Sequence, residues 1–297
     1  MSTTEERNPK SGNIDVLAVE RVLELMNEED AAVIHAVRAA IPSLAKAVEE
    51  AVSAIRRGGR IFYVGAGTSG RIGLIDAAEM PPTFGVSHDL FRAVIAGGDA
   101  SIRKSVEGAE DDVDAGRDSA FSVTSKDMVI GISASGRAPF VLAFLDTARK
   151  RGARTWLMTC NRTEMPLFLD DSTMVMPDGI VEVVTGPEVI AGSTRLKAGT
   201  AAKLVLNMFS SATMIRIGKV YRGLMVDVVP SNKKLVQRAE GIIMEITGCT
   251  REEAGRYLRL AEMRPKVAIV MKARGVSKEE AWDLLRNSGD SLREILG

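Results

Sequence analysis

A glycine- and hydroxyl-rich segment, Gly65–Arg71, is the first part of the sequence whose residue types suggest chemistry. It reads Gly-Ala-Gly-Thr-Ser-Gly-Arg, and its glycine spacing matches the G-x-G-x-x-G pattern of dinucleotide-binding loops. That pattern also requires an acidic residue about 20 positions later, and the nearest strand-end candidate, Asp99, lies farther away. The backbone of Gly67, the hydroxyls of Thr68 and Ser69 and the free N–H groups of a helix start instead predict a phosphate site. The alternative is a tight turn in which Ser69 only caps the helix.

A second hydroxyl-rich segment, Ser133–Arg137, follows another predicted strand and precedes Ala138 and Pro139. Parallel α/β sheets bind ligands at the carboxyl ends of their strands. Two such loops in one sheet therefore predict one small phosphorylated ligand that contacts both. The alternative is an N-capped helix with a proline in its first turn. The predicted binding residues of this loop are Ser133, Ser135, Gly136 and Arg137.

A third segment, Gly186–Thr200, combines hydroxyls with cations ahead of a long predicted helix. Arg195 and Lys197 lie two positions apart, with serine and threonine beside them, and such a cluster suits an anion. The alternative is two solvated surface cations, the usual place for these side chains. We include Glu188, Ser193 and Lys197 of this segment among the predicted binding residues.

Two glutamates are the candidates for acid–base work. Glu79 lies on an apolar predicted helix and precedes two prolines, so we expect it to be partly buried, which would raise its pKa toward that of a general acid. Glu107 and Glu110 follow on a second predicted helix, one turn apart. For any single helical glutamate, a solvated surface position is the common alternative.

The histidines and cysteines of the sequence do not favour a metal site or a thiol nucleophile. His35 and His88 lie too far along the chain from Cys160 and Cys249 for a zinc cluster, and neither histidine has the partners of a Ser-His-Asp set. Both cysteines lie outside the three loops, so a thiol nucleophile is not expected. We predict no metal and no cofactor.

The amino-acid composition excludes some classes of protein. The 297 residues carry 39 Lys and Arg against 39 Asp and Glu, so the net charge is 39 − 39 = 0. That balance argues against a nucleic-acid partner, which needs a cationic surplus. An apolar share of 45% is ordinary for a globular protein. Few cysteines, a polar start and no long uncharged apolar run predict a cytoplasmic protein that neither carries a signal peptide nor spans a membrane.

Strands and helices alternate through the middle of the chain, as in an open parallel α/β sheet. Strands are predicted at 60–65, 91–96, 127–133, 153–160 and within 172–184. Helices are predicted at 69–80, where two prolines end the helix, within 102–121, and at 138–151 and 200–218.

The two ends of the chain are predicted to lack strands. Residues 1–13 read as a mobile tail, and the helical stretches that follow to Arg57 are expected to bend or divide at Pro42. After Pro230, helices are predicted at 234–247, 250–260, 264–274 and 277–287. Thr250 and Ser277 each stand three residues before a glutamate, the pattern of a capping box.

The motifs together resemble the N-acetylmuramic acid 6-phosphate etherase family. The likeness runs in order along nearly the whole chain. It rests on the segments 65–85, 95–98, 106–111, 133–137, 186–200 and 224–229. The resemblance implies a SIS (sugar isomerase) domain: a flavodoxin-like parallel sheet in a three-layer αβα sandwich, with N-terminal helices and a small C-terminal helical bundle like a ubiquitin-associated domain. We divide the chain accordingly into residues 1–48, 49–230 and 231–297. The resemblance also implies a metal-free homodimer with its sites near the subunit interface.

The reaction that this resemblance implies is cleavage of the lactyl ether of N-acetylmuramic acid 6-phosphate by water, in cell-wall recycling. Elimination is followed by hydration. Glu79 matches the family's proton donor and Glu110 its second acid/base. Ser69, Ser133 and Ser135 match the phosphosugar loops, and Lys197 matches a basic position. Ala138 stands where a threonine is common, which removes one hydroxyl from the loop.

Other functions on the same fold remain open. One is a non-catalytic sugar-phosphate sensor, although the related glucokinase regulatory protein carries two SIS domains and this chain has room for one. Another is an aldose–ketose phosphosugar isomerase, because both reactions begin with proton abstraction beside a carbonyl and fold alone cannot separate them. A nicotinamide-dependent enzyme comes last.

Overall fold

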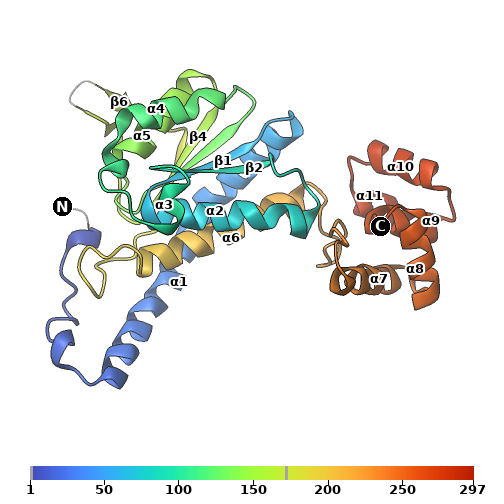
Figure 1. Ribbon diagram of the computed structural model, residues 1–297, viewed down its shortest axis with the longest axis horizontal. Coiled ribbons are helices and arrows are strands. Elements are labelled where there is room, and N and C mark those ends of the chain that lie inside the picture. The colour runs from blue at the N-terminus through green and yellow to red at the C-terminus, as the bar shows by residue number, and fades with distance from the viewer. Residues whose placement is uncertain (1–2, 171–172) are drawn as a thin grey trace. The chain divides into compact units, whose positions relative to one another are not determined.

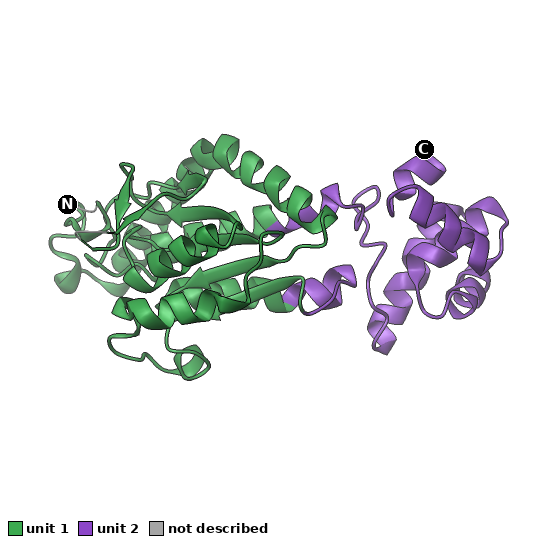
Figure 2. Ribbon diagram, turned by 90° about the horizontal axis from the view of Figure 1, so that it is seen from above, with its two compact units in different colours: residues 1–78, 89–209 green, residues 79–88, 210–297 purple. Residues whose placement is uncertain are grey.

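The computed structural model describes residues 3–170 and 173–297. They form two compact units, shown in different colours in Figure 2. Unit 1 comprises residues up to Ala78 together with Asp89–Phe209, and unit 2 comprises Glu79–His88 and Ser210–Gly297. We describe each unit by itself. The predicted division at residue 48 falls inside a helix of unit 1, and the one at residue 230 falls inside unit 2.

A five-stranded parallel sheet, with strand order β2-β1-β3-β4-β7, forms the centre of unit 1. This agrees with the predicted parallel α/β class. Its two neighbouring central strands, β1 and β3, are buried at every residue, as expected for strands covered on both faces. The strands are β1 (Ile61–Gly65), β2 (Phe91–Ile95), β3 (Met128–Ile132), β4 (Arg154–Thr159) and β7 (Gly179–Glu182). A separate antiparallel pair, β5 (Leu167–Phe168) with β6 (Met174–Val175), includes one strand that we had not predicted.

Helices cover both faces of this sheet and make three layers. Phe62 packs against Phe144 of α5, whereas the next residue, Tyr63, packs against Phe209 of α6, and successive strand residues point to opposite faces. Figure 1 shows α4 and α5 on one side of the sheet, and α2 and α6 on the other. The helices are α1 (Val19–Arg56), α2 (Gly67–Phe84), α3 (Ala100–Arg103), α4 (Val113–Ser119), α5 (Pro139–Lys150) and α6 (Lys197–Arg216).

The N-terminal segment is not the mobile tail that we predicted, as far as the described residues show. The Thr3 hydroxyl donates to the Asn161 side chain over 2.7 Å, and the Asn8 amide donates to Glu29 over 2.7 Å. Thr4 and Asn8 are buried. Polar side chains that fold onto the body of unit 1 satisfy its buried groups, which composition alone does not reveal.

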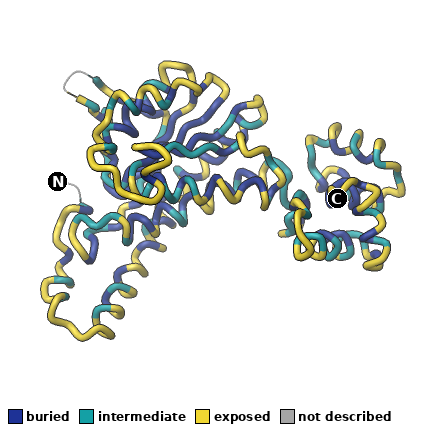
Figure 3. Tube along the Cα trace, in the orientation of Figure 1, coloured by how far each residue is buried: buried dark blue, intermediate teal, exposed yellow. Residues whose placement is uncertain are grey.

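Helix α1 is a single helix of 38 residues with Pro42 inside it, so the predicted division at that proline was wrong. Proline removes one backbone hydrogen bond, but a buried stripe runs along the helix on both sides of it, visible as dark blue turns in Figure 3. Length and composition alone would also let α1 cross a membrane. In the structure the helix lies against the sheet, where Glu50 accepts a hydrogen bond from the Trp156 indole over 2.9 Å.

Helix α2 is also longer than predicted. It begins at Gly67 and continues through Pro81 and Pro82 to Phe84, so the prolines do not end it. Met80 and Phe84 on this last stretch are buried, and that burial offsets the missing proline N–H bonds.

The segment from 100 to 122 is more broken than the one or two helices predicted there. It contains α3, the 3-10 helix Ala109–Asp111 (η3), α4 and the 3-10 helix Ala120–Ser122 (η4). Gly108 adopts a φ of 73°, a left-handed conformation that interrupts a helix and favours glycine. Asp112 then starts α4 afresh by accepting the Ala115 N–H over 2.8 Å.

Unit 2 contains the C-terminal bundle. Four of its helices were predicted to within a few residues, and the last one was not predicted. The helices are α7 (Lys233–Thr247), α8 (Arg251–Leu260), α9 (Pro265–Arg274), α10 (Lys278–Asn287) and α11 (Leu292–Leu296). The buried ammonium of Lys266 on α9 ties them to the chain before α7, since it donates to the Gly218 carbonyl over 2.9 Å and to the Asp290 carboxylate over 2.9 Å.

Both predicted capping boxes are present at the starts of α8 and α10. We expect Thr250→Ala to lower the free energy of unfolding of unit 2 by about 1 kcal/mol, because the Glu253 N–H loses its acceptor. Thr250→Asn, which retains a side-chain oxygen, is the control. Denaturant unfolding followed by circular dichroism measures both, and equal stabilities of the two variants would contradict the capping role.

Candidate functional site

The first predicted phosphate segment forms the junction between β1 and α2. Gly70 has no room for a side chain: a Cβ there would lie 2.6 Å from Ile95 Cγ1 and 2.8 Å from the Gly65 carbonyl oxygen. Since α2 begins at Gly67, Thr68 and Ser69 lie in its first turn, and Ser69 is not the N-cap. The first backbone N–H groups of an α-helix have no partner inside that helix, so this turn offers donors to an anion.

The second predicted segment forms a compact turn after β3. The buried Ser133 Oγ accepts hydrogen bonds from the N–H groups of Gly136 and Ala138, over 3.1 and 3.4 Å. Ser135 Oγ accepts from the Arg137 N–H over 3.2 Å and lies 3.3 Å from Ser133 Oγ. The hydroxyls of Ser133 and Ser135, which we predicted as ligand contacts, therefore also hold the loop in its conformation.

This turn borders a cavity of about 630 Å³. Ser135, Gly136 and Arg137 line it, together with Arg162 and Thr163, which follow β4. Arg162 was not among the predicted binding residues. The only signal for it was its place just after the predicted fourth strand, at the end of the sheet where ligands bind.

The two segments lie at the same edge of the sheet. Strands β1 and β3 are parallel neighbours, with Gly65 paired to Ile132, so the residues that follow them emerge side by side. The structure thus places the Gly67–Ser69 turn and the Ser133–Arg137 turn at neighbouring strand ends of one sheet edge, as predicted, although they line different cavities.

Glu110 lies in η3, at a smaller cavity of about 180 Å³ that we call the Glu110 cavity. Its polar lining residues are Arg71, Ser101, Lys104, Ser105 and Glu110, and the backbone of Gly67 also borders it. Partial burial raises the pKa of Glu110, and repulsion from Asp111 adds to the shift. The side chain remains exposed at the rim, where it can exchange protons with a bound ligand.

Arg71 closes one side of this cavity, a role that the sequence analysis did not assign. Its Nε donates to the Ile102 carbonyl over 3.0 Å and its Nη2 to the Lys104 carbonyl over 3.3 Å. The guanidinium therefore holds the segment after β2 against the start of α2. Its position as the last residue of the glycine-rich motif was the available signal.

Glu79 is exposed, so the expectation that it is partly buried was wrong for this chain by itself. It lies on α2 in the segment that belongs to unit 2. The buried side of the helix at this level carries Asp76, Ala77 and Met80, whereas Glu79 and Ala78 point away from it. The apolar neighbours seen in the sequence alternate around the helix and do not enclose the carboxylate.

Glu188 and Lys197 form a buried polar centre rather than an open anion site. Glu188 is fully buried and accepts the N–H groups of Lys197 and Ala198, over 2.9 and 3.0 Å, at the start of α6. The Lys197 ammonium donates to Glu29 over 2.9 Å and is only 2% exposed. The solvated-cation alternative therefore does not apply to Lys197, whereas the neighbouring Arg195 is exposed.

Glu29 is the carboxylate at the middle of this centre. Burial acts to raise its pKa, but hydrogen bonds from Lys10, Lys197 and Asn8 outweigh that effect and lower the pKa to about 2. Ser193, four residues before Lys197 in the sequence, is half-buried in a turn where its N–H donates to the Ile190 carbonyl over 2.9 Å. Ligand binding by Glu188, Ser193 and Lys197 stays a prediction.

Cys160 offers little to catalysis. Burial raises the pKa of its thiol to about 12, and repulsion from Glu188 adds to the shift. A thiol with so high a pKa is not ionised near neutrality. Within residues 3–170 and 173–297, no group of three or more His, Cys, Asp or Glu side chains is placed to hold a metal ion.

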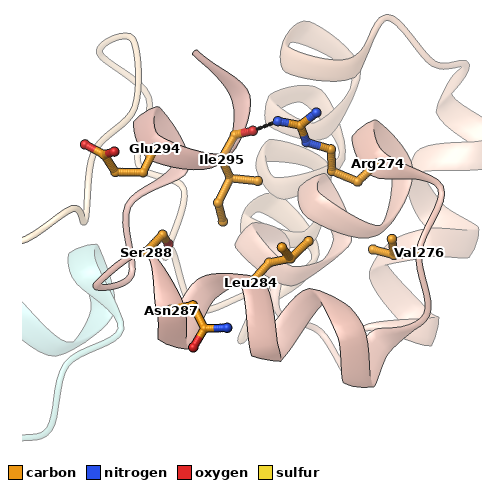
Figure 4. A pocket seen from close by; sticks show the side chains of 7 residues that line it. All are labelled: Arg274, Val276, Leu284, Asn287, Ser288, Glu294 and Ile295. Carbon is orange, nitrogen blue, oxygen red and sulfur yellow. Dashed lines mark hydrogen bonds between the residues drawn. The ribbon is translucent and has the colours of Figure 1, made fainter.

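A larger cavity, of about 850 Å³, lies in unit 2 and contains none of the predicted site residues. Figure 4 shows its lining, with Glu294 and Arg274 on opposite sides of Ile295, whose carbonyl accepts a hydrogen bond from the Arg274 guanidinium. Its residues come from α9, α10, α11 and the turns beside them, so it belongs to the C-terminal bundle.

Comparison with known proteins defines the class to which this sheet and its loops belong. Residues 43–149 match the family described as the glucokinase regulatory protein N-terminal SIS domain. Two solved structures, phosphoheptose isomerases from Neisseria gonorrhoeae and Francisella tularensis, align with 65% and 67% of this chain and with 97% and 100% of theirs. Their identities are 18% and 14% and their TM-scores 0.42 and 0.46. The family match places the SIS-type sequence between α1 and α5, on the strands and helices of the parallel sheet.

Curated relatives identify the family within that class. The N-acetylmuramic acid 6-phosphate etherase of Geobacillus thermodenitrificans is 48% identical over 99% of this chain and 98% of its own. Those of Rhizobium rhizogenes and Histophilus somni are 46% and 44% identical over 99% of this chain, and over 94% and 95% of theirs. The chain belongs to the N-acetylmuramic acid 6-phosphate etherase family.

Proposed function

We propose that this protein is an N-acetylmuramic acid 6-phosphate etherase. It cleaves the D-lactyl ether with water and releases N-acetylglucosamine 6-phosphate and D-lactate, a step in peptidoglycan recycling. The observation that carries this proposal is the likeness to relatives of that name over 99% of the chain. A coupled assay for D-lactate, with the purified chain and N-acetylmuramic acid 6-phosphate, tests it. No lactate release would contradict it.

In this proposal the sheet edge holds the phosphate. The N–H groups at the start of α2, the hydroxyls of Thr68 and Ser69 and the turn Ser133–Arg137 surround it. Arg137 and Arg162 line the cavity beside that turn and supply positive charge for the phosphate oxygens.

The chemistry is elimination followed by hydration on the open-chain aldehyde. A carboxylate removes the proton at C2, and a carboxylic acid protonates the ether oxygen at C3 as the C3–O bond breaks and D-lactate leaves. Water then adds to C3 of the unsaturated aldehyde, and a proton returns to C2. We assign these transfers to Glu79 and Glu110, with Glu79 as the donor to the leaving oxygen. The raised pKa of Glu110 suits a group that gains and loses a proton during each turnover.

We further propose a homodimer whose sites lie near the subunit interface. Ile75, 53% exposed, and the exposed Ala78 stand beside Glu79 on α2. A second copy laid on this surface would cover the apolar side chains and exclude water from the Glu79 carboxylate. Analytical ultracentrifugation measures the assembly, and a monomer at assay concentrations would contradict it.

The two free, buried cysteines support a cytoplasmic location.

A sugar-phosphate sensor is the second candidate function, because the family match over residues 43–149 is to the SIS domain of a regulatory protein. Calorimetric binding of N-acetylglucosamine 6-phosphate, without turnover of N-acetylmuramic acid 6-phosphate, would favour it over the enzyme. An aldose–ketose isomerase would instead form a ketose phosphate from an aldose phosphate.

The net charge of zero predicts a modest dependence of the reaction on salt. Without a cationic surplus the protein exerts little long-range attraction on an anionic substrate. We expect kcat/KM to fall by less than about tenfold between low and high ionic strength. A steeper fall, measured at constant pH with the lactate assay, would show that long-range steering contributes.

A further inference from the structure

The Glu110 cavity contains a buried hydroxyl that folding leaves unused. Ser101 lines the cavity and is only 3% exposed, and its Oγ has no hydrogen-bond partner among the described residues. Buried polar groups are normally paired, so an unpaired one at a cavity wall indicates a ligand that supplies the partner. Gly97 packs closely against this hydroxyl, since a Cβ there would lie 2.2 Å from Ser101 Oγ, so a larger residue at position 97 would displace it.

Two cations face the same cavity without a carboxylate of their own. The Nε and Nη2 of Arg71 donate hydrogen bonds to the carbonyls of Ile102 and Lys104. The other guanidinium N–H groups remain available to a ligand. The exposed Lys104 side chain makes no ion pair in the part of the chain that the structure describes. A hydroxyl and two cations around about 180 Å³ form a site for a small anion.

Part of the wall is apolar. Ala66, Ala96, Val106 and Ala109 form it, while Ser105, the Glu110 carboxylate and the backbone of Gly67 complete the lining. Small apolar side chains beside cations suit an anion that carries a short hydrocarbon part, rather than a fully charged phosphate. A lactyl group has this composition, since one methyl and one carboxylate share a single carbon.

The place of the cavity in the sheet fits a substrate whose phosphate lies at the β3 turn. Ala66 and Ala96 follow β1 and β2, whereas Ser133 follows β3, the neighbour of β1 on its other side. Strands in a sheet lie about 4.8 Å apart, so the two places are roughly 5–10 Å apart. That separation is comparable with the span of an open-chain sugar from its C6 phosphate to a substituent at C3.

We propose that the Glu110 cavity binds the carboxylate of the D-lactyl ether, through Ser101, Lys104 and Arg71. The inference rests on the proposed etherase function and adds the residues that distinguish an ether of lactate from an unsubstituted sugar phosphate. Lys104 and Ser101 donate hydrogen bonds to the carboxylate. Arg71, which also holds the segment after β2, contributes charge at the cavity wall.

Steady-state kinetics of Lys104→Met and Ser101→Ala test this subsite with two substrates, N-acetylmuramic acid 6-phosphate and its lactyl methyl ester. We expect Lys104→Met to raise KM for the acid by about tenfold, the size of one lost hydrogen bond between charged groups, and to raise the inhibition constant of D-lactate by a similar factor. KM for the methyl ester and the inhibition constant of inorganic phosphate should change less than about twofold. Lys104→Arg should restore most of the affinity for the acid.

Arg103→Met is the matched control, because it removes a neighbouring exposed cation that does not line the cavity. An equal loss for the acid and the ester would overturn the carboxylate assignment, as would a Lys104→Met enzyme with unchanged constants. A weakened phosphate inhibition would place the phosphate in this cavity instead. If the wild-type chain releases no lactate, the proposed function fails and the subsite with it; normal wild-type release with unaltered variants overturns the subsite alone.

Discussion

Glu79→Gln and Glu110→Gln are each expected to lower the rate of D-lactate release by about 10²–10⁴-fold, the usual contribution of one general acid or base. Glutamine keeps the size and much of the hydrogen bonding of each side chain but neither accepts nor donates the proton. Both side chains are exposed in the single chain, so their replacement should not disturb the core. The loss should therefore appear in kcat rather than in the folding of the protein.

Glu107→Gln provides the matched control, since this exposed glutamate lies three residues before Glu110 and has no proposed proton to move. All three variants should give the circular dichroism spectrum of the wild type. Deuterium incorporation at C2 of N-acetylglucosamine 6-phosphate in heavy water separates the two roles, because it needs only the group that exchanges the C2 proton. Wild-type lactate release by both glutamine variants would refute the acid–base assignment.

The pH profile gives a further readout of Glu110. Partial burial, followed by repulsion from Asp111, raises the pKa of this carboxyl above its ordinary value of 4.5. We expect one limb of the kcat/KM profile to lie above that value and to vanish in Glu110→Gln. A profile that keeps the same limb in the variant would assign it to another group.

Lys197→Met is expected to destabilise the fold by on the order of 3 kcal/mol, because it leaves the buried Glu29 carboxylate without its buried partner. Lys10→Met removes the other cation that contacts Glu29, but the Lys10 side chain is 58% exposed. Exposed ion pairs contribute about 0–1 kcal/mol, so this second variant should be much milder. Denaturant unfolding at neutral pH compares the two.

The pH dependence of stability follows from the same carboxylate. The folded-state pKa of Glu29 is about 2, below its ordinary value of 4.5, so its stabilising contribution is present above about pH 4.5 and is lost as the pH falls toward 2. Lys197→Met should raise that pKa and move the acid loss to higher pH. The double variant Glu29→Gln, Lys197→Met should recover part of the stability. If Lys197→Met is no more damaging than Lys10→Met, the buried pair has no structural role.

Local sequence patterns were sufficient for most of the fold. Five short, largely apolar runs bounded by turns or charged residues became the five parallel strands. The reason is clearest for β1 and β3, because a strand buried on both faces needs little beyond continuous apolar side chains. Capping boxes at Thr250 and Ser277 marked two helix starts correctly, since the interactions lie within four residues. Proline was the misleading signal. It implied a bend or division at Pro42 and a helix end at Pro81, but packing of the rest of each helix offset the lost hydrogen bonds.

Local sequence patterns likewise predicted some features of the candidate site and not others. Glycine and hydroxyl patterns placed two phosphate-type turns at one sheet edge, because strand order and direction follow from the alternation of strands and helices. The chemical state of individual side chains did not follow from these patterns. Lys197 reads as an ordinary loop cation, but Glu29, 168 residues away in sequence, reaches its ammonium. Arg162 and Ser101 lacked any motif that marked them.

The sequence by itself therefore determined the family and the parallel sheet, because both are encoded in local order and spacing. The assignment of proton transfer to Glu79 and Glu110 stays a prediction from the resemblance. Only the tertiary structure decided which groups are buried, paired or left unsatisfied. It pairs Lys197 with Glu29, exposes Glu79 and leaves the Ser101 hydroxyl without a partner at the Glu110 cavity. The physical reason is that burial and charge pairing depend on side chains distant in sequence, and only folding brings them within hydrogen-bonding distance.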